Sequence, residues 1–259
     1  MSGIAIERSG AKATLFLNRP ERHNAFDDSL IGELDAALAE LAADPAVRIV
    51  LLAGKGKSFS AGADLGWMKR MASYGAAENE ADALALGDML HRLDSLSKPT
   101  IAIVQGAAMG GGAGLVAACD IAIAAEDAQF AFSEARLGLI PAAISPYVLA
   151  AIGARAARRY FLTAERFDAR QALALGLVSA VLPGAGLAAE ADRIADLLIA
   201  NGPAAMAEAK RLIADVSGRP VDQALRAETA RRIAERRAST EGREGVAAFL
   251  EKRKPSWVK

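Results

Sequence analysis

Apolar and polar positions in the first half of the chain predict short strands that alternate with helices. Apolar runs of strand length recur, and between them apolar residues return at helical spacing. This alternation favours an α/β fold. The predicted strands cover 4–7, 13–17, 47–52, 101–104, 120–124 and 129–132. The predicted helices begin after Asp27 or Asp28, cover 81–96 and follow the glycines at 110–112, whereas 66–76 fits neither pattern.

The second half of the chain has a different pattern. From Ile144 onward it reads as almost wholly helical, and the dipeptide Gly202-Pro203 is typical of a boundary between elements. We therefore predict two parts, a core of residues 1–202 and a helical region of residues 203–259 that is rich in arginine and glutamate. The helical region has few apolar residues for a core of its own, so we expect it to pack on a neighbouring subunit.

Composition and charge exclude several functional classes. Of the 259 residues, 53% are hydrophobic, which predicts a substantial core. Lys+Arg and Asp+Glu number 31 each, so a net charge of zero gives no electrostatic reason to bind nucleic acid or an anionic membrane. The N-terminus lacks the pattern of a signal peptide, and the single cysteine, Cys119, fits a reducing compartment. We therefore expect a cytoplasmic protein with neither nucleic acid nor membrane as a partner.

The glycine run Gly110-Gly111-Gly112 stands between a predicted strand and a helix of small residues. Glycine costs backbone entropy on folding, and a chain usually accepts that cost where backbone N–H groups must approach another group closely. A helix N-terminus presents unpaired N–H groups and a partial positive charge. This arrangement suits a carbonyl oxygen that becomes negative during a reaction. From this run alone, such a site and a tight turn without chemistry are equally open.

Glu134 is the candidate acid or base. Alternation places Phe130, Phe132 and Glu134 on one side of a strand, if the strand extends that far. A carboxylate in apolar surroundings has a raised pKa, which suits proton transfer near neutral pH. From the pattern alone, however, a surface glutamate at the end of a strand is the more common case.

Other familiar sites do not fit this sequence. A phosphate-binding loop ending in Gly56-Lys57 would need glycine at position 51, which is Leu51. His23 and His91 have no neighbouring ligands, whereas zinc needs three or four. A Gly-x-Ser-x-Gly turn, which would carry a serine nucleophile, is absent from the sequence. We therefore expect neither a metal site nor a serine hydrolase.

Four internal motifs follow one another along the chain: Phe59-Ser60-Ala61-Gly62-Ala63-Asp64-Leu65, Met109-Gly110-Gly111-Gly112, Cys119-Asp120 and Ser133-Glu134-Ala135-Arg136-Leu137-Gly138. Together they resemble the enoyl-CoA hydratase/isomerase (crotonase) family. The N-terminal Asn18-Arg19-Pro20 and the stretch that ends at Trp257 resemble the two ends of the family, so the resemblance covers nearly the whole chain. It implies a crotonase-like spiral of repeated ββα units with a C-terminal helical trimerisation region, assembled as a homotrimer or homohexamer. It also implies an acyl-CoA thioester substrate and no separate cofactor, since coenzyme A is part of the substrate.

The resemblance also implies roles for residues of this chain. The backbone N–H groups of Ala63 and Gly111 are expected to form an oxyanion hole for the thioester oxygen, and Glu134 is expected to act as acid and base. Coenzyme A is expected along Arg22 and residues 61–65, with Lys252 near its phosphates. The full set of expected substrate-binding residues is Arg22, Ala61, Gly62, Asp64, Leu65, Gly110, Ser145 and Lys252.

The chain departs from the two-glutamate hydratases at Gly114, where those enzymes carry a second glutamate. Its run Ile144-Ser145-Pro146-Tyr147 resembles bacterial methylglutaconyl-CoA and isohexenylglutaconyl-CoA hydratases of leucine and acyclic terpene breakdown. This resemblance implies hydration of a branched, carboxylated enoyl-CoA. Such a substrate needs a cation in the acyl pocket, for which Arg70, Arg136 and Arg158 are the candidates.

The reaction itself is open to more than one interpretation. One glutamate is enough to move a proton between C2 and C4. The Δ3,Δ2-enoyl-CoA isomerases of this family, which act in fatty acid metabolism, work in this way. The absence of a second glutamate at Gly114 favours isomerisation, whereas the run 144–147 favours hydration, which we weigh somewhat higher. In a hydratase, Glu134 would both activate water and deliver the proton, or share the task with a second water or Ser145. RNA binding, which the zero net charge disfavours, and thioester hydrolysis are the remaining alternatives.

Overall fold

The strands of the computed structural model, which describes residues 2–258, form two sheets. Within the larger sheet β1 and β2 are antiparallel and every other neighbouring pair is parallel. This mixed α/β arrangement confirms the predicted fold class. The larger sheet has the order β1 (Ile4–Ser9), β2 (Lys12–Leu17), β3 (Ile49–Gly54), β4 (Thr100–Val104), β6 (Ile121–Ala125) and β9 (Ala180–Leu182). The smaller sheet has the order β5 (Ala107–Met109), β7 (Gln129–Ala131) and β8 (Phe167–Asp168).

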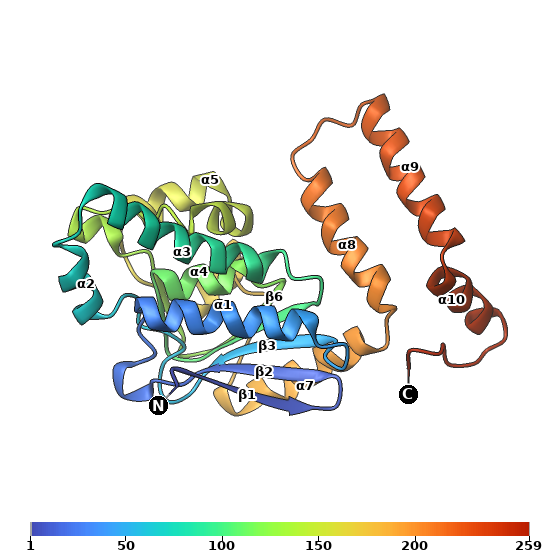
Figure 1. Ribbon diagram of the computed structural model, residues 1–259, viewed down its shortest axis with the longest axis horizontal. Helices are drawn as coiled ribbons and strands as arrows, with labels where there is room; N and C mark the ends of the chain where they lie inside the picture. The colour runs from blue at the N-terminus through green and yellow to red at the C-terminus, as the bar shows by residue number, and fades with distance from the viewer. Residues whose placement is uncertain (1, 259) are drawn as a thin grey trace.

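Helices cover both faces of the larger sheet (Figure 1). Helices α1, α3 and α4 contribute to the main hydrophobic core on one face, and α7 packs on the other. The α-helices are α1 (Asp28–Ala43), α2 (Leu65–Met71), α3 (Ala76–Asp94), α4 (Gly111–Ala118), α5 (Ser145–Thr163), α6 (Ala169–Leu175), α7 (Leu187–Ile199), α8 (Pro203–Val216), α9 (Gln223–Ala238) and α10 (Thr240–Leu250).

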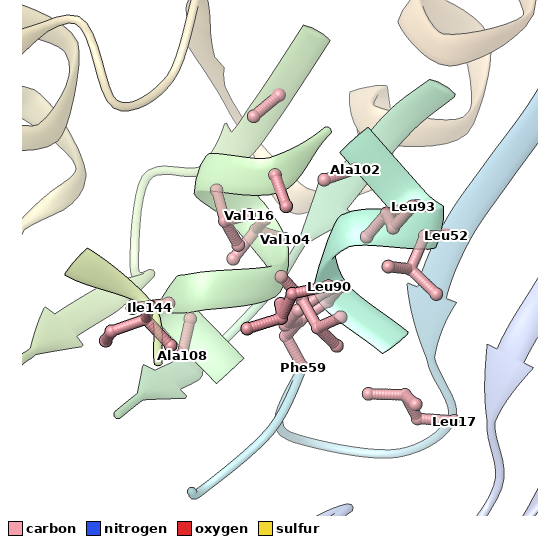
Figure 2. Packing of buried hydrophobic residues seen from close by; sticks show 14 of the residues in the cluster. Leu17, Leu52, Phe59, Leu90, Leu93, Ala102, Val104, Ala108, Val116 and Ile144 are labelled. Atoms are coloured by element: carbon pink, nitrogen blue, oxygen red, sulfur yellow. The ribbon is translucent and has the colours of Figure 1, made fainter. Parts of the chain in front are cut away.

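The larger sheet has a hydrophobic core on each face, and the side chains of the central strand β3 contribute to both. All six of its residues are buried, as expected for a parallel strand covered on both faces. Successive side chains point to opposite faces, so Val50 and Leu52 join the main core while Ile49 and Leu51 pack towards α7. Figure 2 shows Leu52 within the main core, together with Leu93 of α3.

Several predicted boundaries need correction. Asp27, not Asp28, caps α1, because its side chain accepts a hydrogen bond from the N–H of Leu30 at 2.8 Å. The ambiguous stretch 66–76 contains most of α2, and the helix predicted over 81–96 begins earlier, at Ala76. The chain beyond Ile144 is mainly helical, as predicted, but the short strands β8 and β9 also lie there and complete the two sheets.

The strand that leads to Glu134 is shorter than the alternation suggests. Strand β7 ends at Ala131, and Glu134 begins the 3₁₀ helix η2 (Glu134–Leu137). The interpretation that Phe130, Phe132 and Glu134 lie on one side of a single strand is therefore wrong. A turn, rather than strand alternation, sets the direction of the glutamate.

The last helices lie to one side of the sheets, and α9 and α10 extend away from them (Figure 1). Arg48 joins this region to the rest of the chain, since its guanidinium donates to the carbonyl oxygens of Trp257 at 3.0 Å and Asn201 at 2.6 Å. Large apolar side chains of the region are exposed, including Phe249 and Leu250. The division at residues 202 and 203 and the trimeric assembly stay predictions. Among the described residues, no helix has both the length and the apolar character needed to cross a membrane.

Candidate active site

A cavity of about 670 Å³ opens between α2, α3, the glycine run before α4 and the loop that follows β7. Most of its lining is apolar and includes Trp67, Met71 and Leu86. Among the described residues that line it, only Glu134 and Asp82 are charged. An apolar cavity with a few polar groups is the usual form of a small-molecule site. The cavity therefore suits an apolar group held beside a carboxylate.

The loop that carries residues 61–65 is fixed against strand β5. The N–H of Ser60 donates to the carbonyl of Ala107 at 2.9 Å, and the N–H of Met109 donates to the carbonyl of Ser60 at 2.9 Å. The Ser60 hydroxyl is fully buried and donates to the carbonyl of Asn24 at 2.8 Å. The loop and the glycine run therefore stand side by side at the cavity.

Backbone N–H groups at this junction are left without an acceptor among the described residues. They include those of Ala63 and Gly111, the predicted oxyanion-hole donors, and both residues line the cavity. Gly111 is the first residue of α4, where an N–H group has no partner inside the helix. The positive end of the helix dipole lies at the same place. The arrangement can stabilise negative charge on an oxygen atom bound in the cavity.

Close packing explains why this junction is rich in glycine. A Cβ atom on Gly112 would lie 2.8 Å from both the Cβ and the carbonyl oxygen of Ser60. Gly62 has a φ of +93°, and a Cβ there would lie 3.2 Å from the carbonyl oxygen of Met109. The glycines therefore let the Ala63 loop approach α4 closely. The sequence left this close approach and a tight turn without chemistry equally open, and the structure shows the close approach.

Replacing Gly112 by alanine should push the Ser60 loop away from α4 and separate the two N–H donors. We expect turnover to fall by roughly a hundredfold, the usual effect of losing one oxyanion-hole donor. Steady-state kinetics with an enoyl-CoA substrate measure this. Gly87→Ala is the matched control, because a Cβ at Gly87 meets nothing within 4 Å. Equal turnover in the two variants would contradict the interpretation.

Glu134 lies against the start of α4, and one oxygen of its carboxylate is buried without a partner. A Cβ on Gly110 would lie 3.2 Å from Oε1 of Glu134, and Gly110 has a φ of +50° that favours glycine. Oε2 is buried and has no hydrogen-bond partner among the described residues. Burial raises the pKa of Glu134 above its ordinary value. The carboxyl group can therefore exchange a proton with a molecule in the cavity.

Aromatic packing supports the turn that presents Glu134. Phe130 and Phe132 are fully buried, and both rings pack against Phe167 of β8. Phe132 also meets Phe161 of α5 edge to face, with 5.1 Å between ring centroids. These contacts fix β7 and Phe132, the residue that follows it. The turn that carries Glu134 is therefore anchored in the core.

The place of the absent second glutamate is filled by a hydrocarbon side chain. A Cβ on Gly114 would lie 2.2 Å from Cγ2 and 2.9 Å from Cβ of Ile144. Ile144 is buried and lies at the edge of the main core near Ala108 (Figure 2). Gly114 and Ile144 therefore form a complementary pair, and Ile144 also lines the cavity. Sequence patterns did not indicate this pair, because its members are thirty positions apart.

Asp82 is the second acidic group of the cavity, and our sequence analysis missed it. Its Oδ1 accepts a hydrogen bond from the indole Nε1 of Trp67 at 3.0 Å. Asp82 stands four and eight positions before Leu86 and Leu90, so it occupies the apolar side of α3. A carboxylate in an apolar helical stripe is a signal that could have identified it.

The structure brings together most, but not all, of the predicted site residues. Arg22 and Asp64 do not line the cavity: they lie 3.5 Å apart as an ion pair, and Asp64 caps α2 by accepting from the N–H groups of Gly66 and Trp67. The residues that do line it are Ala61, Gly62, Ala63, Leu65, Gly110, Gly111 and Glu134.

Ser145 and Lys252 are also away from the cavity lining. The Ser145 hydroxyl donates to the carbonyl of Ala142 at 2.8 Å at the start of α5, so its expected share in the proton relay is not supported. Lys252 follows α10, which lies far from α2 in Figure 1. Within one chain it does not reach the site, and its contact with coenzyme A stays a prediction that requires a neighbouring subunit. Residues 2–258 contain no group of three or more acidic, histidine or cysteine side chains placed to hold a metal.

Comparisons with known proteins identify the family to which the chain belongs. The sequence profile of the enoyl-CoA hydratase/isomerase family matches residues 7–259. An enoyl-CoA hydratase of known structure from Shewanella pealeana is 46% identical, with a TM-score of 0.96 over 98% of this chain and 96% of that chain. A short-chain-enoyl-CoA hydratase from Clostridium acetobutylicum is 33% identical over 98% of this chain and 97% of its own length. A crotonyl-CoA hydratase from Syntrophomonas wolfei is likewise 33% identical, over 98% and 97%. The chain belongs to the enoyl-CoA hydratase/isomerase (crotonase) family.

Proposed function

We propose that the protein is an enoyl-CoA hydratase that adds water across the 2,3 double bond of an acyl-CoA thioester with a single glutamate. The observation that carries this proposal is the unpartnered, buried Oε2 of Glu134 beside the free N–H groups of Ala63 and Gly111. A carboxylate and two amide donors at one cavity match the needs of a reaction that forms an enolate. The names of related proteins agree with hydration.

The proposed reaction divides the work between the backbone and Glu134. The thioester carbonyl oxygen accepts hydrogen bonds from Ala63 and Gly111, which draws electrons away from C3. Glu134, in its ionised form, removes a proton from a water molecule that attacks C3. The enolate oxygen is stabilised by the same two donors while C2 takes up a proton from the carboxyl group of Glu134. The glutamate ends in its starting state.

Δ3,Δ2-Enoyl-CoA isomerisation is the second candidate, and the Gly114–Ile144 pair favours it. Ile144 occupies the place where two-glutamate hydratases hold their second carboxylate, so water in this cavity has one fewer acceptor. Moving a proton from C4 to C2 needs one base and no water. The same oxyanion donors would serve both reactions. The two reactions therefore differ in whether oxygen from water is incorporated into the product.

Turnover in H₂¹⁸O distinguishes the two reactions. We expect crotonyl-CoA to give a 3-hydroxyacyl product that carries the label, faster than hex-3-enoyl-CoA is converted to its 2-enoyl isomer. Mass spectrometry of the products and the ratio of the two kcat/KM values measure this. Isomerised product without label, together with no hydration of crotonyl-CoA, would replace hydration by isomerisation.

The methylglutaconyl-CoA substrate suggested by residues 144–147 has less support. Its terminal carboxylate needs a cation, and none of the three candidate arginines lines the cavity within one chain. Arg70 pairs with Asp28 at 2.6 Å, while Arg136 and Arg158 are exposed on η2 and α5. We therefore propose a 2-enoyl-CoA with a neutral acyl chain, straight or branched, as the substrate class to test first.

A further inference from the structure

We propose that Asp82 determines substrate specificity by excluding acyl chains that end in a carboxylate. The inference rests on the proposed function, because it assumes that the acyl chain of a CoA thioester enters the cavity beside Glu134. It goes beyond that function by assigning a role to a residue outside the catalytic group. Asp82 lies on α3, whereas the oxyanion donors and Glu134 come from the loops around α4 and β7.

The charged side chains that line the cavity are all acidic. Its lining carries two carboxylates, Glu134 and Asp82, and no Lys, Arg or His among the described residues. Arg22, the expected coenzyme contact, is outside this lining, where it pairs with Asp64. An acyl chain in the cavity therefore meets apolar side chains and two acids.

One carboxylate oxygen of Asp82 accepts a hydrogen bond that holds the side chain in place. The other oxygen is free to interact with a ligand in the cavity. Oδ1 accepts from Trp67 Nε1 at 3.0 Å, and among the described residues no donor or cation pairs with Oδ2. Trp67 is itself buried and lines the same cavity. The hydrogen bond joins α2 to α3, so the carboxylate is fixed relative to the acyl pocket rather than free to turn away.

Apolar surroundings make the effect of this charge large. The lining on α2 and α3 around Asp82 includes the half-buried side chains of Met68 and Leu86, which contribute to excluding water when a chain fills the cavity. Like charges repel more strongly where water is excluded, and unfavourable charge pairs are a common source of specificity. A terminal carboxylate would meet Asp82 without a compensating cation. A methyl group at the same position would make only apolar contacts.

Two thioesters of equal length test the proposal. Pent-2-enoyl-CoA ends in a methyl group and glutaconyl-CoA ends in a carboxylate. In the wild-type enzyme we expect kcat/KM for glutaconyl-CoA to be at least about tenfold lower, which corresponds to about 1.4 kcal/mol. Asp82→Asn keeps an oxygen that can accept from Trp67 and removes the charge. In this variant we expect the ratio to shift about tenfold towards glutaconyl-CoA, while pent-2-enoyl-CoA changes little.

A matched control separates the position of the charge from its mere presence. Asp88→Asn removes one negative charge from the same helix at an exposed site outside the lining. This variant should leave the ratio of the two substrates unchanged. Should Asp82→Asn fold poorly, Asp82→Ser provides a second variant without the charge. A loss of activity that is equal for both thioesters would assign Asp82 a structural role and overturn the proposal.

Binding of saturated analogues keeps this test independent of the reaction. Calorimetry with pentanoyl-CoA and glutaryl-CoA gives the same comparison of methyl with carboxylate without turnover. Weaker binding of glutaryl-CoA in the wild type, relieved by Asp82→Asn, supports the proposal even if hydration fails. Equal binding of the pair overturns it even if hydration is observed. The two conclusions can therefore fail separately.

Discussion

Replacing Glu134 by glutamine should lower kcat by between about a hundredfold and ten thousandfold, the range that general acid and base groups contribute. Glutamine has nearly the same size and can keep the contact with the start of α4, but it can neither accept a proton from water nor return one to C2. The two N–H donors of Ala63 and Gly111 remain, so KM should change much less than kcat. Initial rates with crotonyl-CoA across a substrate series measure both constants.

The pH dependence of the wild-type rate provides a second test of the role of Glu134. Burial raises the pKa of Glu134, and attack by water needs its ionised form. The rate should therefore fall as the pH drops through a pKa above the ordinary 4.5 of glutamate. Glu134→Gln should lack this acidic limb in its residual rate. Glu126→Gln, at an exposed position, is the control that should retain it. A Glu134→Gln enzyme with near wild-type turnover would remove the glutamate from the mechanism.

Local sequence patterns indicated those features of the fold and the site that depend on residues close together in the chain. The glycine run at 110–112 marked a junction that suits either a close backbone approach or a tight turn without chemistry, and the structure shows the close approach. Strand β3 and the helix after Asp27 follow directly from apolar periodicity. The direction of Glu134 was missed, since it depends on where β7 stops, and contacts with Phe161 and Phe167 from later elements hold that end of the strand.

The parts that sequence could not predict depend on pairs of distant residues. Nothing near Gly114 indicates that Ile144 fills the space above it, and nothing near Trp67 indicates that Asp82 accepts its indole N–H. The same limit applies to Lys252, whose expected contact with coenzyme A requires a second chain. Resemblance supplied the family and the candidate catalytic positions. It did not supply the charge of the acyl pocket, which follows only from which side chains the fold brings together.

Replacing Gly114 by glutamate should strongly destabilise the protein, and removing the side chain of Ile144 should restore part of that stability. The new Cβ would overlap the buried Ile144, at 2.2 Å from its Cγ2. Overpacking of this kind costs about 1–3 kcal/mol or more. Urea unfolding measures it for Gly114→Glu, Ile144→Gly and the double variant. Because the two side chains compete for one space, their effects should depart from additivity by about 0.5–3 kcal/mol.

The double variant also tests why the second carboxylate is absent. With Ile144 removed, a glutamate at 114 has room beside the cavity and gives water a second acceptor, so hydration should increase relative to isomerisation. Product ratios in H₂¹⁸O measure this change. Gly87→Glu is the matched control, since a Cβ at that position of α3 meets nothing within 4 Å and should cost little stability. If Gly114→Glu proved as stable as Gly87→Glu, packing against Ile144 would not be what keeps position 114 a glycine. The one-glutamate site would then need an explanation in the reaction itself.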